Sequence, residues 1–173
     1  MNLYQVKKIL TTCPHCFNTL KNEYPQFGGH FEVLHYTEVL ADFITKGRLR
    51  PVREIEKSIV YHDSCYLGRY NDVYDAPRRI LRGIPGLQRV ELKRNMSDSF
   101  CCGAGGGRMW MEELIGQRIN EVRTREILEQ KPDIIGTACP YCLTMFEDGI
   151  KAEDADEKVV ARDILEVLAQ SMT

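Results

Sequence analysis

Seven cysteines are the residues of this 173-residue chain whose types and spacing point most clearly to chemistry. They form two CxxC pairs, one adjacent pair and one isolated cysteine: Cys13 with Cys16, Cys139 with Cys142, Cys101 with Cys102, and Cys65. A chain of this length can bury a core without covalent staples, so paired and clustered thiols favour metal binding or redox chemistry over a disulfide framework. The sequence therefore predicts a site made of several thiolates.

Three separate segments could bring five of these thiols to one metal centre. We predict that the ligands are Cys65, Cys101, Cys102, Cys139 and Cys142. A cluster of iron and sulfide needs thiolates from separate loops, because ligands close in sequence cannot surround it. A CxxC pair at the start of a helix points both sulfurs to one side, and the helix N-terminus lowers the thiol pKa. A structural zinc bound by four thiolates is the alternative.

Glycines follow the adjacent cysteine pair. Neighbouring side chains in an extended segment point to opposite faces, so Cys101 and Cys102 can share a site only if the backbone turns sharply. Gly103, Gly105 and Gly106 permit such a turn and would let backbone N–H groups approach a negatively charged cluster. We therefore predict that these three glycines line the cofactor site.

His62 precedes Cys65 by three residues. Its ring could donate a hydrogen bond to a cluster sulfur or assist proton transfer to a thiolate product. A partly buried histidine at the end of a strand is an equally good interpretation. The sequence leaves both interpretations open.

The two CxxC segments belong to an internal repeat. KKILTTCPHCFNTL aligns with PDIIGTACPYCLTMF, and each is followed by a helix-forming stretch, EVLADFI or DILEVLA. Only the second copy has a long leader that contains Cys65 and the adjacent pair. We therefore expect residues 1–48 to be the C-terminal remnant of a first cysteine-rich repeat. Residues 49–173 would be a complete second repeat, packed with the remnant as one globular unit.

The first repeat lacks its other half in this sequence. We expect that half before Met1 in a longer two-repeat protein, or on a companion chain. Cys13 and Cys16 correspond to the last two ligands of their copy, so they mark a second site whose other ligands are absent. We favour a metal-free pair there, and a thioredoxin-like dithiol is a further interpretation.

Strands alternating with helices are predicted along the second repeat. The expected strands are residues 58–62, 87–93 and 133–138, and each precedes a cysteine segment. Three helices are expected: a short one within 75–86, the longest over 109–130, and one that starts at Pro140. This order predicts an α/β fold of Rossmann-like βα units with a mostly parallel sheet and the cysteines at the carboxyl ends of its strands.

Composition restricts the classes of function. The formal net charge is −2, and no long basic stripe suggests a nucleic-acid partner. No apolar run reaches the roughly 18 residues of a membrane span. The first residues, MNLYQVKKIL, lack a signal-peptide pattern. We expect a cytoplasmic protein with no nucleic-acid partner, which reaches a membrane only through another protein.

The spacing Cys-x35-Cys-Cys-x36-Cys-x-x-Cys resembles the cysteine-rich, or CCG, domain of heterodisulfide reductase catalytic subunits. Similar domains occur in other iron–sulfur oxidoreductases, usually in two copies. The runs DSCYLGRYNDVYDAPRRIL and CCGAGGGRMWMEE look most like the members linked to electron-transfer flavoprotein. The resemblance implies a 4Fe-4S cluster of the noncubane kind, bound by all five cysteines.

The resemblance also implies a function. An oxidoreductase of this type, working within a larger complex, passes electrons between a flavoprotein or iron–sulfur partner, such as an electron-transfer flavoprotein, and a disulfide, thiol or quinone acceptor. This chain has no ferredoxin-type run of closely spaced cysteines, so electrons would arrive through another domain or subunit. The alternative is a non-catalytic assembly module stabilised by zinc, and zinc could also replace iron after handling in air.

Overall fold

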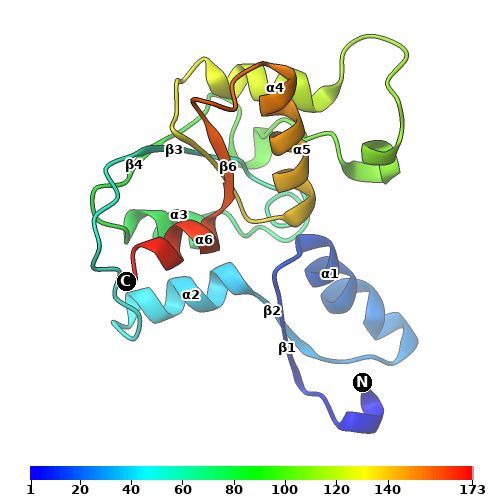
Figure 1. The fold of residues 1–173 in the computed structure, drawn as a ribbon. Coiled ribbons are helices and arrows are strands. Elements are labelled where there is room, and N and C mark those ends of the chain that lie inside the picture. The colour runs from blue at the N-terminus through cyan, green and yellow to red at the C-terminus, as the bar shows by residue number, and fades with distance from the viewer. Residues whose placement is uncertain (173) are drawn as a thin grey trace.

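Four parallel strands in the spatial order β4-β3-β5-β6 form the larger sheet of this computed structural model, which describes residues 1–172 (Figure 1). The strands are β3 (Ser58–Tyr61), β4 (Gln88–Val90), β5 (Ile134–Thr137) and β6 (Val160–Asp163). The helices around them are α3 (Asp75–Arg82), α4 (Ile119–Leu128), α5 (Pro140–Ala152) and α6 (Ile164–Gln170). The predicted α/β class with a parallel sheet is confirmed.

Apolar side chains on both faces of the sheet explain why helices cover both sides. Ile59 and Ile134 pack in a core with residues of α3 and α6, whereas Val60 and Ile135 pack in a second core with residues of α4 and α5. Successive side chains of a strand point to opposite faces, so each strand feeds both cores. Parallel strands buried on both faces have this continuous apolar character.

A smaller, two-stranded parallel sheet contains the first CxxC segment. Its elements are β1 (Lys8–Thr11), α1 (Pro14–Asn18), β2 (Glu32–His35) and α2 (Tyr36–Thr45). α2 packs against α3, and its residues Tyr36 and Ala41 belong to the same core as Ile59 (Figure 1). The first segment therefore shares a core with the second, while the division into domains at residue 48 stays a prediction.

The structure gives both CxxC segments the same order of elements. Cys13 and Cys139 each follow a strand in extended conformation and cap a helix that begins with proline. His35 and Asp163 then each end the next strand and form a capping box with a glutamate at the third helical position. The two segments have the same helix caps at equivalent positions, which explains why the same capping residues and proline recur in the sequence.

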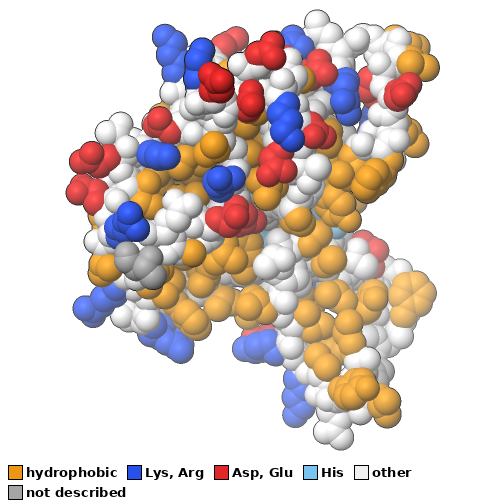
Figure 2. Space-filling view, viewed as in Figure 1, with side chains coloured by type: hydrophobic (Ala, Val, Ile, Leu, Met, Phe, Trp, Pro, Cys, Tyr) orange, Lys and Arg blue, Asp and Glu red, His pale blue; other side chains and the backbone are white. Residues whose placement is uncertain are grey.

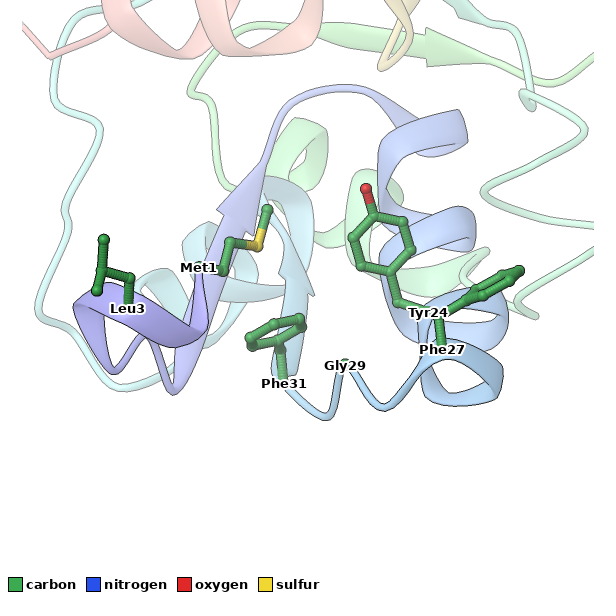
Figure 3. Close-up of a pocket in the computed structure, with 6 residues that line it drawn as sticks. All are labelled: Met1, Leu3, Tyr24, Phe27, Gly29 and Phe31. Carbon is green, nitrogen blue, oxygen red and sulfur yellow. The ribbon is translucent and has the colours of Figure 1, made fainter.

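The surroundings of the two segments differ. β5 lies between β3 and β6, whereas β1, within the part of the chain that the structure describes, pairs only with β2. Leu10 is 59% exposed, and its counterpart Gly136 lies under the Ile59 side chain of β3. Apolar side chains also gather near the N-terminus (Figure 2), and five of them surround a hollow beside Gly29 (Figure 3). These are Met1, Leu3, Tyr24, Phe27 and Phe31.

Two predicted elements differ from the structure. The helix expected over 109–130 is wrong in its first half, because α4 begins only at Ile119. Within the predicted range, Met111 is extended and Gly116 has a positive φ angle that a helix cannot contain, so no α-helix forms before Ile119. Leu114 is consequently 87% exposed, and α5, rather than this segment, is the longest helix described.

The strand expected over 87–93 is shorter than predicted. It forms only Gln88–Val90, at the edge of the sheet, where β3 is its single neighbour among the described residues. Four other predicted elements are confirmed, and their strand ends or helix starts agree with the structure to within one residue. They are the strands at 58–62 and 133–138, the short helix within 75–86 and the helix that starts at Pro140. Among residues 1–172, no helix has the length and apolar character needed to cross a membrane.

His35, the cap of α2, is fully buried and has a defined set of partners. Nδ1 lies 2.8 Å from Thr37 Oγ1 and accepts the Thr37 backbone N–H, while Nε2 lies 3.3 Å from the Thr12 carbonyl oxygen. A neutral ring suits these contacts, because Nδ1 must accept and Nε2 must donate. Burial lowers the His35 pKa from 6.5 to about 4.

We predict that the free energy of unfolding falls as the pH drops from 6.5 to about 4. In that range the unfolded chain takes up a proton at His35 that the folded chain excludes, which corresponds to about 3 kcal/mol at most. His35→Asn keeps a cap acceptor without titrating and should lose this part of the pH dependence. His30→Asn, at an exposed histidine, should retain it. Urea unfolding at several pH values tests this, and identical profiles for wild type and His35→Asn would contradict it.

Candidate metal centre

The strand order places two cysteine loops next to each other at one edge of the sheet. In the order β4-β3-β5-β6 the connections leave β3 and β5 in opposite directions, so a crevice opens at their carboxyl ends. Cys65 follows β3 and Cys139 follows β5 directly. Cys101 and Cys102 arrive from β4 through a ten-residue excursion rather than from a strand end. Three loops thus reach the edge where open α/β sheets bind ligands.

These loops bring five thiols into one interacting set, which we call the five-cysteine centre. Its members are Cys65, Cys101, Cys102, Cys139 and Cys142. The sulfurs of Cys102 and Cys142 are 3.2 Å apart. Cys102, Cys139 and Cys142 are buried, whereas Cys65 and Cys101 are half-buried. The five thiols predicted from spacing therefore lie together, and their role as ligands stays a prediction.

Close packing makes these thiols share protons. Contacts with Cys101 and Cys142 lower the pKa of Cys102 well below its usual value, and the contact with Cys102 raises the pKa of Cys101. The contact with Cys142 lowers the pKa of Cys139 to about 5, while the pKa of Cys142 is raised by Cys102 and Cys139. A bound cation would release the remaining protons, because the thiolate is the form that binds metal.

A buried ion pair positions two of the three loops. Both Asp63 oxygens accept from the Arg78 guanidinium, at 2.7 and 2.8 Å, and both side chains are at most 4% exposed. Asp63 Oδ2 also accepts the Met96 backbone N–H at 2.8 Å, and the Ser99 hydroxyl donates to the Asp63 carbonyl oxygen at 3.1 Å. The Cys65 loop is thereby joined to the loop before Cys101. Sequence reasoning missed both members of this pair.

Gly103 is the glycine that the geometry of the centre requires. Its φ is +91°, and a Cβ there would lie 3.1 Å from the Asn120 backbone nitrogen and 3.2 Å from Ile119 Cβ. Its N–H donates to Cys101 Sγ at 3.3 Å. Gly105 and Gly106, by contrast, are exposed and have open space around them. The sharp turn is observed at Gly103, and a cofactor contact of the other two glycines stays a prediction.

Unpartnered polar atoms lie around the cysteine loops. His62 Nδ1, Ser64 Oγ and Thr137 Oγ1 are buried, and the described residues provide them with no hydrogen-bond partner. His62 also lies with Cys102 and Cys142 in a group whose ligand atoms are all within 4.8 Å of one another. Buried donors without partners are costly unless a bound group accepts from them. These donors and the thiol set therefore fit an inorganic cluster with sulfide acceptors.

Cys13 and Cys16 lie beside the five-cysteine centre but are more open. Cys16 is exposed and Cys13 half-buried. Burial opposes ionisation of Cys13, but hydrogen bonds from His15 and nearby backbone N–H groups outweigh it and lower the pKa. The pKa of Cys16 is raised by burial and by Cys13. Cys139 is close enough to Cys13 to oppose its ionisation by charge repulsion. Metal binding at this pair stays a prediction.

The fold and the centre together define a class: an α/β protein with a polythiolate centre at the switch point of a parallel sheet. The model of the family described as Cysteine-rich domain (CCG) matches residues 59–147, which run from β3 through all five cysteines. The chain belongs to this family.

Three curated relatives are similar to nearly the whole chain. The "Probable iron-sulfur-binding oxidoreductase FadF" of Bacillus subtilis is 55% identical over 167 residues, 96% of this chain and 24% of the relative. The "EtfAB:quinone oxidoreductase" of Syntrophomonas wolfei is 48% identical over 178 residues, 99% of this chain and 25% of the relative. A subunit of the dihydromethanophenazine:CoB–CoM heterodisulfide reductase of Methanosarcina barkeri is 39% identical over 170 residues, 96% of this chain and 41% of the relative. The chain thus spans less than half the length of each.

We predict that Gly103→Ala lowers the iron content of the chain. An alanine at this positive φ is strained by about 1–2 kcal/mol, and its Cβ would press against the backbone of Asn120 and so displace the N–H that Cys101 accepts. Gly116→Ala is the matched control, because Gly116 also has a positive φ but open space around it and is outside the predicted cofactor site. Iron per chain after anaerobic reconstitution is the measurement. An equal iron loss in both variants would contradict the special place of Gly103.

We predict that Arg78→Met destabilises the chain by about 3–5 kcal/mol, because it leaves the Asp63 carboxylate buried without its partner. The neighbouring Arg79 is 42% exposed and pairs with the exposed Asp75 across one helical turn. Arg79→Met should therefore change the stability by about 0.5 kcal/mol or less. Urea unfolding of both variants measures the difference. Similar losses for the two arginines would refute the positioning role of the Asp63–Arg78 pair.

Proposed function

We propose that this chain is the part of an iron–sulfur oxidoreductase that holds a four-iron cluster on the five-cysteine centre and passes electrons through it. The observation that carries the proposal is the convergence of five thiols from three loops at one sheet edge. The printed names of the relatives, which include an iron-sulfur-binding oxidoreductase and a heterodisulfide reductase subunit, support it. A four-iron cluster, when bound, supplies one-electron chemistry.

The chain's own residues decide how the centre is held and reached. Cys102, Cys139 and Cys142 form its buried side, so they shield it from water. Cys65 and Cys101 are half-buried, so an acceptor approaches from their side. His62 Nδ1 has no partner among the described residues, so it is available to donate a hydrogen bond to a sulfur of the centre. Such a hydrogen bond would offset part of the negative charge on that sulfur. The acceptor is a disulfide, a thiol or a quinone, and the names of two relatives cover a disulfide and a quinone.

Electrons reach this centre from a partner. No run of closely spaced cysteines typical of a ferredoxin occurs in the sequence, so the donor is a separate flavoprotein or iron–sulfur domain or subunit, such as an electron-transfer flavoprotein. The proposal places the chain in the cytoplasm, where thiols remain reduced. Contact with a membrane would then come through the partner.

The missing half of the first repeat is proposed to dock on the open edge of β1, either from the same polypeptide or from a companion chain. In the second segment β3 covers the equivalent edge of β5, pairing Ile59 with Ile134 and Val60 with Ile135. At β1 the side chain of Leu10 is exposed, and a hollow lined by Leu10, Leu34 and Phe43 lies between the small sheet and α2. A parallel strand paired with β1 would bury this surface.

A zinc-stabilised assembly module is the second candidate function. The observation in its favour is the compact group of His62, Cys102 and Cys142, whose ligand atoms all lie within 4.8 Å of one another. With one more thiolate this set would suit tetrahedral zinc. Such a module would hold the loops together without passing electrons.

We predict about four irons per chain, and little zinc, in protein purified without oxygen. The iron should give an EPR signal during a redox titration. Cys142→Ser should lose the iron, whereas Cys16→Ser, at the equivalent position of the first CxxC and exposed, should keep it. Metal analysis and EPR of the three proteins test the proposal. One zinc per chain and no EPR signal at any potential would instead support the assembly module.

A further inference from the structure

His15, the third residue of the CPHC run, lies between the two CxxC segments. Its ring centroid is 4.3 Å from that of Tyr66, which follows Cys65, and 5.0 Å from that of Tyr141, inside the second CxxC. Nδ1 lies 3.8 Å from Cys13 Sγ. The ring also lies close enough to the Cys139 thiol to lower its pKa, and Cys139 raises the pKa of His15. One side chain of the first segment thus reaches two loops of the five-cysteine centre.

The internal repeat separates the role of the aromatic ring at this position from the role of its nitrogens. His15 and Tyr141 occupy the same position in their CxxC segments, and their rings meet edge to face across the boundary between the segments. Tyr141 shows that an aromatic ring without nitrogen can fill this position. A phenyl ring at residue 15 would keep the contact with Tyr66 and Tyr141 but would offer nothing to a sulfur.

We propose that His15 is a positioning residue for the five-cysteine centre, which donates a hydrogen bond to Cys139 from the first CxxC segment and thereby sets the reduction potential of the second. This inference rests on the proposed function. Hydrogen bonds to ligand sulfurs are among the features that tune the potential of an iron–sulfur centre. A donor stabilises the reduced state most, because that state has the greater negative charge. Removal of the donor should therefore make the centre harder to reduce.

The test compares the midpoint potential of the centre in anaerobically purified wild type, His15→Phe and His15→Gln by EPR-monitored titration. His15→Phe keeps the ring and removes both nitrogens, whereas His15→Gln keeps a donor. His30→Phe, at an exposed histidine outside these contacts, is the matched control. Iron per chain and far-UV circular dichroism show that each variant is folded and loaded. If His15→Phe does not fold, His15→Leu and His15→Gln provide the same comparison.

A role for the ring nitrogens predicts that His15→Phe lowers the ratio of reduced to oxidised centre about tenfold at a fixed potential, which is about 59 mV for a one-electron step. His15→Gln should restore most of this ratio, and His30→Phe should match wild type. Equal potentials in all loaded proteins would overturn the inference and leave the proposed function intact. An equal shift in His15→Phe and His15→Gln would show that only packing matters and would also overturn it. Wild type without iron would overturn the proposed function and the inference together.

Discussion

The buried ion pair between Asp63 and Arg78 is the constraint on which the geometry of the centre depends. A carboxylate this deeply buried is stable only when its charge is paired and its oxygens are occupied, and Arg78 and the Met96 N–H do both. Arg78 is in turn held by Glu91, at 2.8 Å. The chain that leads to Cys101 therefore folds back onto the Asp63–Arg78 pair, which lies beside Cys65. The pair thereby brings two cysteine loops together.

The third loop reaches the centre by a different physical route. Cys139 caps α5, Pro140 gives up a backbone N–H that the first helical turn does not need, and both thiols of this CxxC are buried under the sheet edge. No buried charge is required, because the strand and the helix already fix the loop between them. Closely packed thiolates repel each other, so a bound cation would favour their ionised form.

The parts of this arrangement that sequence predicts are those with local causes. Alternating strands and helices, the proline after Cys139 and the spacing of the five cysteines were sufficient to place Cys65 and Cys139 at the carboxyl edge of β3 and β5. The Asp63–Arg78 pair could not be predicted, because an aspartate before a turn and an arginine in a helix are common and only the tertiary fold brings them together. The apolar residues before Ile119 led to a wrong helix prediction because their local pattern is not the one that the backbone follows. Their spacing was helical, but the extended backbone at Met111 and the positive φ angle of Gly116 interrupt a helix there.

The internal repeat separates what a CxxC segment does from what its neighbours do. Cys13 and Cys139 cap equivalent helices in the same backbone conformation, yet Cys139 is fully buried and Cys13 is half-buried. The same holds for the second thiols, since Cys142 is buried and Cys16 exposed. The strand–CxxC–helix unit therefore points two thiols to one side but does not bury them. Enclosure comes from β3 with Cys65 and from the loop that Gly103 turns. The incomplete repeat reaches this enclosed centre from outside, through His15 at Tyr66 and Tyr141 and through Asn18 at Asn71.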